Sequence, residues 1–356
     1  MEVKLTVPKI EIKQLIQSTC SIIDVRSPSE YREFHIPGAI NLPIFSDEER
    51  AEVGTIYKQK GNEFAKERGV AILSNKLPAL YEEVKELSRA SEGKPIIVYC
   101  WRGGMRSRSI VSVMGMLDIP TIQLEGGVRA YRRLITEELE ASLHQSKKYI
   151  VLEGLTGTKK TDILIELQKK GYPVIDLELL AGHRGSIFGH IGLHPRSQKE
   201  FESLLYTRLT ELRKFPYYVI EAESKRIGNV NLPDFLMIGK EKGIRIHLDM
   251  TLEDRAKTIC DTYRLEENSE QFIEAIHRLK KRLSIDTFTN ILSLLEIGDY
   301  HSIVELLLKN YYDPRYGYAF EKYITPIHPI FIESLEEGLH MVTEKIKEIV
   351  EEYSIV

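Results

Sequence analysis

Cysteine and tryptophan are scarce in this chain. Its 356 residues include three cysteines, at positions 20, 100 and 260, and a single tryptophan. The cysteines form no C-x-x-C pair, and no spacing of cysteines and histidines suggests structural zinc or a disulfide framework. The spacing instead predicts free thiols in a reducing, cytoplasmic environment, where a reactive cysteine survives.

Long apolar runs are also missing. No stretch approaches the ~20 residues of a membrane-spanning helix, and MEVKLTVPKI at the N-terminus has no signal-peptide core, so we expect no membrane partner. The sequence shows no internal repeat or low-complexity tract. With 42% apolar and 29% charged residues, it is typical of a globular protein of about two domains. Its formal net charge of −4 means that a nucleic-acid partner would need a local basic patch.

The most informative segment is YCWRGGMRSR, at residues 99–108. Cys100 follows an apolar stretch over 95–99 that is typical of a β-strand, and a helix is expected from Ser107 onward. Glycines let the intervening loop turn its N–H groups inward, at the positive end of the helix dipole. Such a loop favours a thiolate and holds an anion over the sulfur, which predicts covalent group transfer through Cys100. The expected anion loop comprises Arg102, Gly103, Gly104, Arg106 and Ser107.

A second signature precedes this loop. The run DVRSPSEYREFHIPGAINLP at residues 24–43 begins at the end of a short apolar strand. Together with the later CWRGGMRS, it resembles the rhodanese (sulfurtransferase) domain, a small α/β module whose catalytic cysteine ends the central strand. The resemblance implies that Cys100 is the nucleophile and that Asp24 and Arg26 support its loop. An ordinary strand-end ion pair is the alternative interpretation of Asp24 and Arg26.

A phosphate-binding loop is predicted further along the chain. A strand expected over 149–153 leads into GLTGTKKT at 154–161, and a helical pattern follows. In such P-loops, backbone N–H groups surround phosphate oxygens, the lysine neutralises them, and the threonine can hold Mg²⁺. The usual pattern has glycine where this chain has Lys159, so the sequence leaves open whether the loop hydrolyses nucleotides. An incidental glycine-rich turn is the alternative interpretation. The expected phosphate-binding residues are Gly154, Thr156, Gly157, Thr158, Lys159, Lys160 and Thr161, with Thr161 as a candidate Mg²⁺ ligand.

Three more strands are expected at 174–177, 217–221 and 244–248, which would complete a P-loop α/β domain. Asp176 and Glu221 each lie at a strand end. Either of them would act on the metal ion as a Walker-B acid does. Loops rich in Gly, His, Arg and Ser follow two of these strands, where doubly wound sheets bind ligands. The candidate site in these loops comprises His183, Arg184, Ser186, Glu221 and Glu223.

Helical patterns fill two other stretches. The insertion at 46–93 is charged at helical spacing, and its basic residues predict either a solvated face or a contact surface for a polyanion. Residues 253–356 are expected to be mostly amphipathic helix. The tyrosines of 310–318 predict core packing or, with the interleaved arginine, stacking on bases. The basic residues of the insertion are Lys58, Lys60, Lys66 and Arg68.

The order of CWRGGMRS, GLTGTKKT, AGHRGSIFG and YYDPRYGY narrows the resemblance. Over nearly its whole length the chain resembles the tRNA 2-selenouridine synthase family. The resemblance implies a rhodanese-like α/β domain at 1–140 and a P-loop α/β domain with a helical C-terminal region at 147–356. It also implies that selenium from selenophosphate replaces the sulfur of wobble 2-thiouridine in tRNA, through a tRNA geranylated with geranyl pyrophosphate. Selenophosphate synthetase would be a candidate partner.

The resemblance implies roles for both loops. Cys100 would accept selenium from selenophosphate or otherwise assist the exchange at C2 of the base, while Arg102 and Arg106 hold the phosphate. The P-loop would grip the pyrophosphate of the geranyl donor, with Mg²⁺ assisting. An apolar pocket must accept the geranyl chain, and the base must leave the anticodon stack.

Three other functions fit parts of the pattern. The spacing C-x₅-R also occurs in cysteine phosphatases, although WRGGM offers no obvious general acid. A thiosulfate-type sulfurtransferase fused to a nucleotide-binding domain is the second alternative. The third is a non-enzymatic RNA-binding protein that uses both loops only as anion sites.

Overall fold

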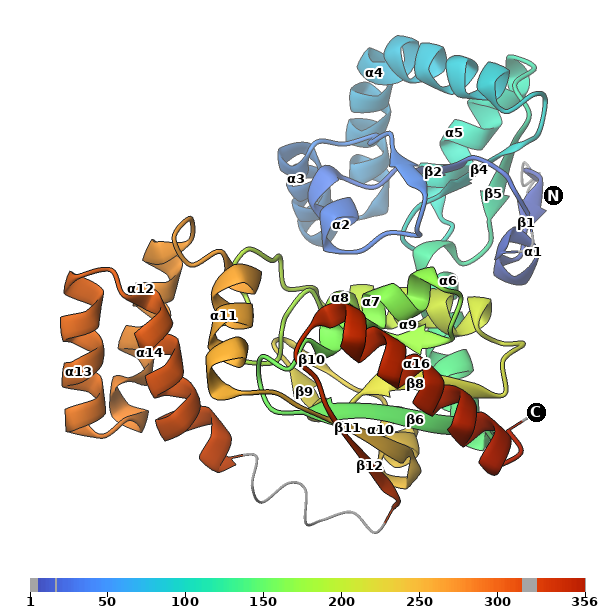
Figure 1. The fold of residues 1–356 in the computed structure, drawn as a ribbon. Coiled ribbons are helices and arrows are strands. Elements are labelled where there is room, and N and C mark those ends of the chain that lie inside the picture. Colours follow the sequence, from blue (N-terminus) through green and yellow to red (C-terminus); the bar gives the residue numbers. More distant parts are fainter. Residues whose placement is uncertain (1–5, 17, 316–324, 356) are drawn as a thin grey trace. The chain divides into compact units, whose positions relative to one another are not determined.

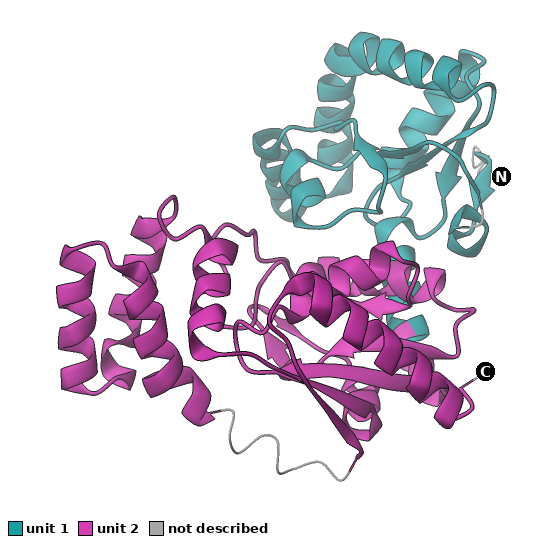
Figure 2. Ribbon diagram, in the orientation of Figure 1, with its two compact units in different colours: residues 1–138 teal, residues 139–356 magenta. Residues whose placement is uncertain are grey.

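The computed structural model describes residues 6–16, 18–315 and 325–355. The chain divides into two compact units, residues 1–138 and 139–356 (Figure 1, Figure 2). Each unit contains a five-stranded parallel sheet with helices, so the α/β fold class expected from the sequence is confirmed. Among the helices described, none is long and apolar enough to cross a membrane.

The sheet of unit 1 has the strand order β1-β5-β4-β2-β3, which places β4 at its centre. All four residues of β4 are buried, as the uninterrupted run Ile-Ile-Val-Tyr requires of a strand covered on both faces. Asp24 at the end of β2 is paired with Tyr99 at the end of β4, so both strands deliver polar residues to the same edge. The strands are β1 (Lys9–Ile10), β2 (Ile22–Asp24), β3 (Ala39–Asn41), β4 (Ile96–Tyr99) and β5 (Thr121–Leu124).

Six helices accompany this sheet in the described part of the chain up to residue 141. The helical insertion is confirmed as α3 and the long α4, and Ser46 begins α3 with a capping box. The helix start expected at Ser107 is wrong by two residues, because α5 begins at Met105 directly after Gly104. The helices are α1 (Ile12–Ile16), α2 (Pro28–Glu33), α3 (Asp47–Lys60), α4 (Asn62–Ala90), α5 (Met105–Met116) and α6 (Gly127–Ala141).

The sheet of unit 2 has the order β12-β11-β6-β8-β7, with the strand before the P-loop at its centre. The strand β12 was not predicted, because the segment after residue 253 has a mainly helical pattern. The predicted strand at 174–177 is shorter than expected, since Leu177 begins α8. The strands are β6 (Lys148–Gly154), β7 (Val174–Ile175), β8 (Tyr217–Glu221), β11 (Ile244–Asp249) and β12 (Ile327–Phe331), with β9 (Arg226–Ile227) and β10 (Val230–Asn231) as a separate antiparallel pair.

One core cluster among the described residues of unit 2 joins α7 and α16 to the sheet. Another gathers Phe272, Ile303 and Tyr311 in the helical region. Tyr311 is thus a core residue, while Tyr316 and Tyr318 lie outside the described residues. The helices are η1 (Ser142–His144), α7 (Lys160–Lys169), α8 (Leu177–Ala181), α9 (Gln198–Glu211), α10 (Asp234–Lys242), α11 (Leu252–Tyr263), α12 (Ser269–Leu279), η2 (Lys280–Arg282), α13 (Ile285–Glu296), α14 (Tyr300–Leu307), η3 (Leu308–Tyr312) and α16 (Leu335–Glu352).

Candidate functional site

Cys100 directly follows the central strand β4, and its side chain is buried against the loop that leads into α5. The Gly104 N–H donates to its Sγ at 3.2 Å, and the Ser107 hydroxyl lies 3.2 Å from the same sulfur. Gln123 Nε2 donates to the Ser107 oxygen at 2.8 Å, so the Ser107 hydroxyl hydrogen can be directed at the sulfur. Two donors and a helix N-terminus therefore face Sγ, an arrangement that stabilises a thiolate.

Close backbone approaches fix the shape of this loop. A Cβ on Gly103, whose φ is +63°, would lie 2.7 Å from the Leu124 carbonyl oxygen. A Cβ on Gly127, at the start of α6, would lie 2.2 Å from the Cys100 carbonyl oxygen. The neighbouring Val128 N–H donates to that same oxygen at 3.0 Å. Both positions therefore require glycine, and sequence reasoning missed Gly127, for which the Gly-Gly pair after β5 was the available signal.

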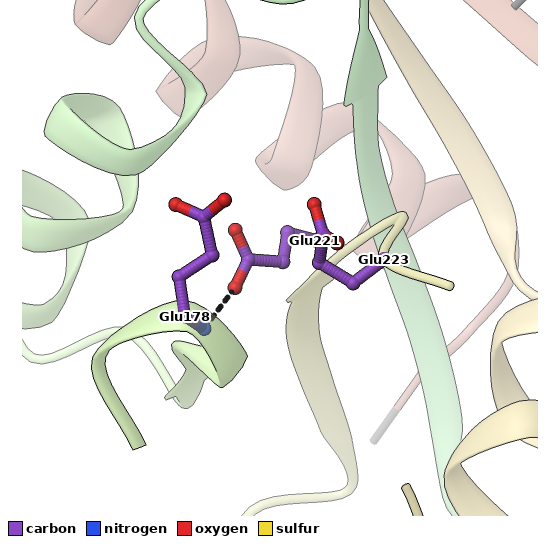
Figure 3. A group of neighbouring side chains, drawn as sticks. All are labelled: Glu178, Glu221 and Glu223. Carbon is purple, nitrogen blue, oxygen red and sulfur yellow. Dashed lines mark hydrogen bonds between the residues drawn. The ribbon is translucent and has the colours of Figure 1, made fainter. Parts of the chain in front are cut away.

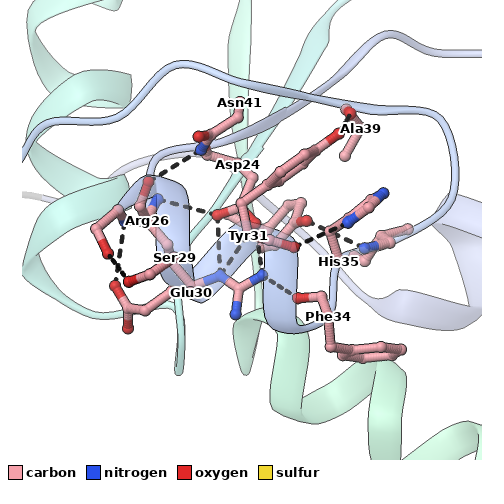
Figure 4. Close-up of polar contacts among 12 residues, drawn as sticks. Asp24, Arg26, Ser29, Glu30, Tyr31, Phe34, His35, Ala39 and Asn41 are labelled. Atoms are coloured by element: carbon pink, nitrogen blue, oxygen red, sulfur yellow. Dashed lines mark hydrogen bonds and ion pairs between the residues drawn. The ribbon is translucent and has the colours of Figure 1, made fainter. Parts of the chain in front are cut away.

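Asp24 and Arg26 form a buried ion pair (Figure 4). Arg26 Nε lies 3.0 Å from both Asp24 carboxylate oxygens, and Nη2 lies 2.6 Å from Oδ2. The guanidinium carbon lies 5.7 Å from the centre of the Tyr99 ring, and Nη2 also donates to the Phe34 carbonyl at 2.5 Å. Because Tyr99 immediately precedes Cys100, this buried pair packs against the base of the cysteine loop.

Arg106 is held by Glu30 of α2. Its Nη1 lies 2.6 Å from Glu30 Oε2, and the same carboxylate accepts from the backbone N–H of Ser27. Burial would raise the pKa of Glu30, but the hydrogen bond and charge of Arg106 outweigh this effect and lower it. The structure thus places Arg106 in an ion pair beside the loop, whereas Arg102 is exposed at its rim.

Breaking the Asp24–Arg26 pair is expected to destabilise unit 1. Asp24→Asn keeps the shape of the side chain but leaves the Arg26 guanidinium buried without a counter-charge, which costs about 3 kcal/mol or more. Urea unfolding followed by the fluorescence of Trp101, the single tryptophan of the chain, measures this unit selectively. Glu52→Gln removes the exposed pair with Arg68 and is the control, and its loss of stability should be much smaller because solvent screens that pair. Equal losses would assign Asp24 no special structural role.

In unit 2, the loop after β6 has the shape of a P-loop around its lysine. Lys160 Nζ donates to the carbonyls of Gly154 at 2.8 Å and Leu155 at 2.9 Å. A Cβ on Gly157 would lie 2.7 Å from the Arg255 carbonyl oxygen, so this glycine is required. Burial lowers the pKa of Lys160, although neighbouring glutamates favour its charged form. A phosphate entering the loop would replace those two carbonyls as the partner of the ammonium group.

Lys159 occupies the position that the P-loop pattern gives to glycine. Its backbone is left-handed, with φ +56° and ψ +19°, and it immediately precedes α7. Non-glycine residues adopt this conformation at a cost of roughly 1 kcal/mol. The chain therefore keeps the P-loop backbone in spite of the substitution and adds a cation beside the loop.

Three glutamates come together in unit 2 (Figure 3), and their charges act on Lys160. One carboxylate oxygen from each of Glu178, Glu221 and Glu223 lies within 4.8 Å of the others. Thr161 Oγ1 donates to Glu178 Oε2 at 3.0 Å, which joins the threonine of the P-loop to this group. Burial and the charge of Glu223 raise the pKa of Glu178 to about 8, and burial raises that of Glu221 well above its usual value. Such mutual repulsion is relieved by a cation, and oxygen ligands suit Mg²⁺.

Of the two candidate Walker-B acids, only Glu221 belongs to this group. Asp176 instead caps α8, where its Oδ1 accepts the Leu179 N–H at 2.8 Å. Glu178, two residues after Asp176, was missed by sequence reasoning. An acidic residue at the first turn of a helix that follows a strand is common, so the sequence did not single it out.

The loops rich in Gly, His, Arg and Ser, which were predicted to bind ligands, lie only partly around the P-loop. A cavity of about 510 Å³ is lined by P-loop residues together with Arg184, Ser186 and Glu223. His183 does not line it and belongs to an adjoining hollow of about 670 Å³. Its Nδ1 accepts the Gly185 N–H at 3.1 Å, so the tautomer is set locally. Further residues that line the first cavity and were not predicted are Lys240, Arg245 and Tyr263.

Comparisons with known proteins agree with the two-unit arrangement. Residues 147–349 match the family model of the tRNA 2-selenouridine synthase AAA domain, and residues 9–134 match that of the rhodanese-like domain. The tRNA 2-selenouridine synthase of Marinobacter nauticus is 31% identical, over 83% of this chain and 87% of its own. That of Sulfurovum sp. (strain NBC37-1) is 30% identical, over 88% and 92%. That of Bdellovibrio bacteriovorus is 33% identical, over 75% and 71%.

Proposed function

Because this chain belongs to the tRNA 2-selenouridine synthase family, we propose that it modifies tRNA by replacing the sulfur of wobble 2-thiouridine with selenium. Selenophosphate supplies the selenium, and geranyl pyrophosphate first alkylates the sulfur. The observation that carries the proposal is the Cys100 sulfur, held by the Gly104 N–H and Ser107 hydroxyl at a helix N-terminus. A separate P-loop, whose carbonyls hold the Lys160 ammonium group, supports the use of a pyrophosphate substrate.

Geranyl transfer is assigned to the P-loop of unit 2. The thiocarbonyl sulfur of the base attacks C1 of the geranyl group, the C–O bond breaks, and pyrophosphate leaves while N3 of the base loses its proton. Lys160 and the loop amides hold the pyrophosphate and stabilise the charge that develops on it. Thr161, Glu178 and Glu221 would hold Mg²⁺, which would neutralise the leaving group further.

Electron counting decides how Cys100 acts in the exchange. Selenium in selenophosphate is already at the selenide level, so forming a sulfur–selenium bond to Cys100 would require an oxidant. A redox-neutral path is available instead. The Cys100 thiolate attacks C2 of the S-geranylated base and expels geranyl thiolate, which takes up a proton and becomes geranylthiol. Selenophosphate then attacks C2 and expels the Cys100 thiolate, and water cleaves the Se–P bond, which releases phosphate and returns a proton to N3.

Mass spectrometry of nucleosides tests this function. The full chain is incubated with tRNA that contains 2-thiouridine and with geranyl pyrophosphate, selenophosphate or both. We expect the S-geranylated nucleoside with the first, unchanged 2-thiouridine with the second, and 2-selenouridine with both. A chelator should suppress geranylation if the glutamates and Thr161 hold a catalytic Mg²⁺.

Two outcomes would contradict the proposal. Absence of both products, with an active family member as control, would leave thiosulfate-type sulfur transfer by Cys100 as the working hypothesis. Selenouridine formed equally well without geranyl pyrophosphate would show that alkylation is not part of the reaction.

A further inference from the structure

A large cavity opens beside Cys100 in unit 1. Its volume is about 560 Å³, and it is bounded by α3, α4 and the loop that precedes α5. Volumes of this size are typical of small-molecule sites. Most of its wall is apolar and comes from the helical insertion, and Cys100 is itself a lining residue. The apolar lining includes Phe45, Val53, Ala65, Val70, Leu73 and Met105.

Several of these apolar side chains remain uncovered in the folded unit. Val70 is 66% exposed, Tyr57 59%, Met105 44% and Trp101 39%, and all four line the cavity. Apolar surface gathered around one concavity marks a binding site more often than a random feature of a soluble surface. Folding alone therefore leaves this wall without a partner.

Charge at the cavity is of one sign. Its basic lining residues are Arg50, Lys58, Lys66, Arg102 and Arg106, and no acidic residue is among the lining residues described. Some of these cations have acidic partners outside the lining, since Arg106 binds Glu30 and Lys66 binds Glu63. An apolar wall with basic residues beside it fits an amphiphilic anion, in which an apolar chain is joined to a phosphate-bearing group.

We propose that this cavity binds the isoprenoid chain of the S-geranylated 2-thiouridine, and thereby holds C2 of that base against the Cys100 sulfur. The inference rests on the proposed function. In the S-alkylated base the isoprenoid chain is attached to the sulfur on C2. A base whose C2 lies at the Cys100 sulfur therefore places this chain in the space beside that cysteine. That space is the apolar wall of α3 and α4, and the exposed lining residues Lys58 and Arg102 are available to the nucleotide phosphates.

This assignment gives the isoprenoid chain a role in substrate recognition. A 2-thiouridine without the isoprenoid chain cannot cover Val70, Tyr57 or Met105. The cavity therefore distinguishes the S-geranylated base from its 2-thiouridine precursor. Each buried methylene strengthens binding by about fourfold, which makes chain length the main determinant of affinity.

Trp101 provides a local measurement of occupancy, because it lines the cavity and is the single tryptophan. The full chain is titrated with S-geranyl-2-thiouridine 5′-monophosphate and with its S-methyl analogue, and tryptophan emission is recorded. We expect a saturable blue shift with the geranylated nucleotide, at concentrations at least about 100-fold lower than with the S-methyl analogue. Equal affinities would overturn the inference. Tighter binding of free geranyl pyrophosphate would also overturn it, because the cavity would then be a site for the geranyl donor.

Matched variants test whether the isoprenoid chain lies on the apolar wall of the cavity. Val70→Gln places an amide in the apolar lining, and we expect about tenfold weaker binding of the geranylated nucleotide. Ala71→Gln, at the exposed next position of α4 and outside the lining, is the control and should leave affinity unchanged. Because Val70 is exposed, the substitution should not unfold the helix, and equal thermal stability of the two variants checks this. Equal affinity of the two variants would refute the placement.

The two hypotheses fail separately. Chain-length-dependent binding at Trp101 without formation of 2-selenouridine would sustain the cavity assignment and refute the proposed exchange. Formation of 2-selenouridine at the same rate from S-geranyl and S-methyl RNA would sustain the exchange and refute the cavity assignment.

Discussion

Cys100→Ser is expected to abolish the exchange of sulfur for selenium while geranylation continues. Serine preserves the size of the side chain and both polar contacts, but its hydroxyl is not ionised at neutral pH and cannot attack C2. A loss of at least about 1000-fold in the rate of 2-selenouridine formation is typical for removal of a nucleophile. Incubation with both co-substrates should therefore accumulate S-geranylated RNA, which mass spectrometry of nucleosides detects directly.

Cys20→Ser is the matched control, because Cys20 lies in the same unit and is half-buried. Its activity should equal that of the unchanged chain. Full selenation by Cys100→Ser would mean that selenophosphate attacks C2 without a covalent intermediate, and the thiol would then serve only to bind anions. Loss of geranylation in Cys100→Ser would contradict the assignment of the two reactions to separate loops.

Sequence patterns predicted those parts of the sites that are contiguous in the chain. The cysteine loop and the P-loop each combine a buried strand, glycines and a helix start within about ten residues, so local backbone requirements identify them. The backbone conformation of Lys159 explains why the P-loop survives without its usual glycine.

Residues that reach the sites through tertiary packing were not predictable in the same way. Glu178 joins Glu221 only because β7 and β8 are neighbours in the sheet. The apolar wall beside Cys100 arises where α3 and α4 cover the end of β4, and its side chains are spread over some thirty positions of a charged sequence. Arg106 lines the cavity beside Cys100, but its pairing with Glu30 depends on the fold of α2 and was not predicted.

Replacing Lys160 is expected to give the opposite separation of activities. Lys160→Met keeps an apolar stem of similar length but removes the charge that we propose holds the pyrophosphate, and geranylation should fall by roughly 100- to 1000-fold. Exchange on RNA that already carries S-geranyl-2-thiouridine should proceed at the normal rate, because that step uses Cys100 and releases no pyrophosphate. Separate single-step assays with the two RNA substrates measure both rates.

The control for this variant is Lys169→Ala, at the exposed end of the same helix α7. It removes an equal charge from unit 2 without touching the P-loop, so both rates should be unchanged. If Lys160→Met and Cys100→Ser each lost both activities equally, the two loops would form one interdependent catalytic centre. Reciprocal losses would instead show that each loop carries out its own step, because each variant then completes the step that the other cannot.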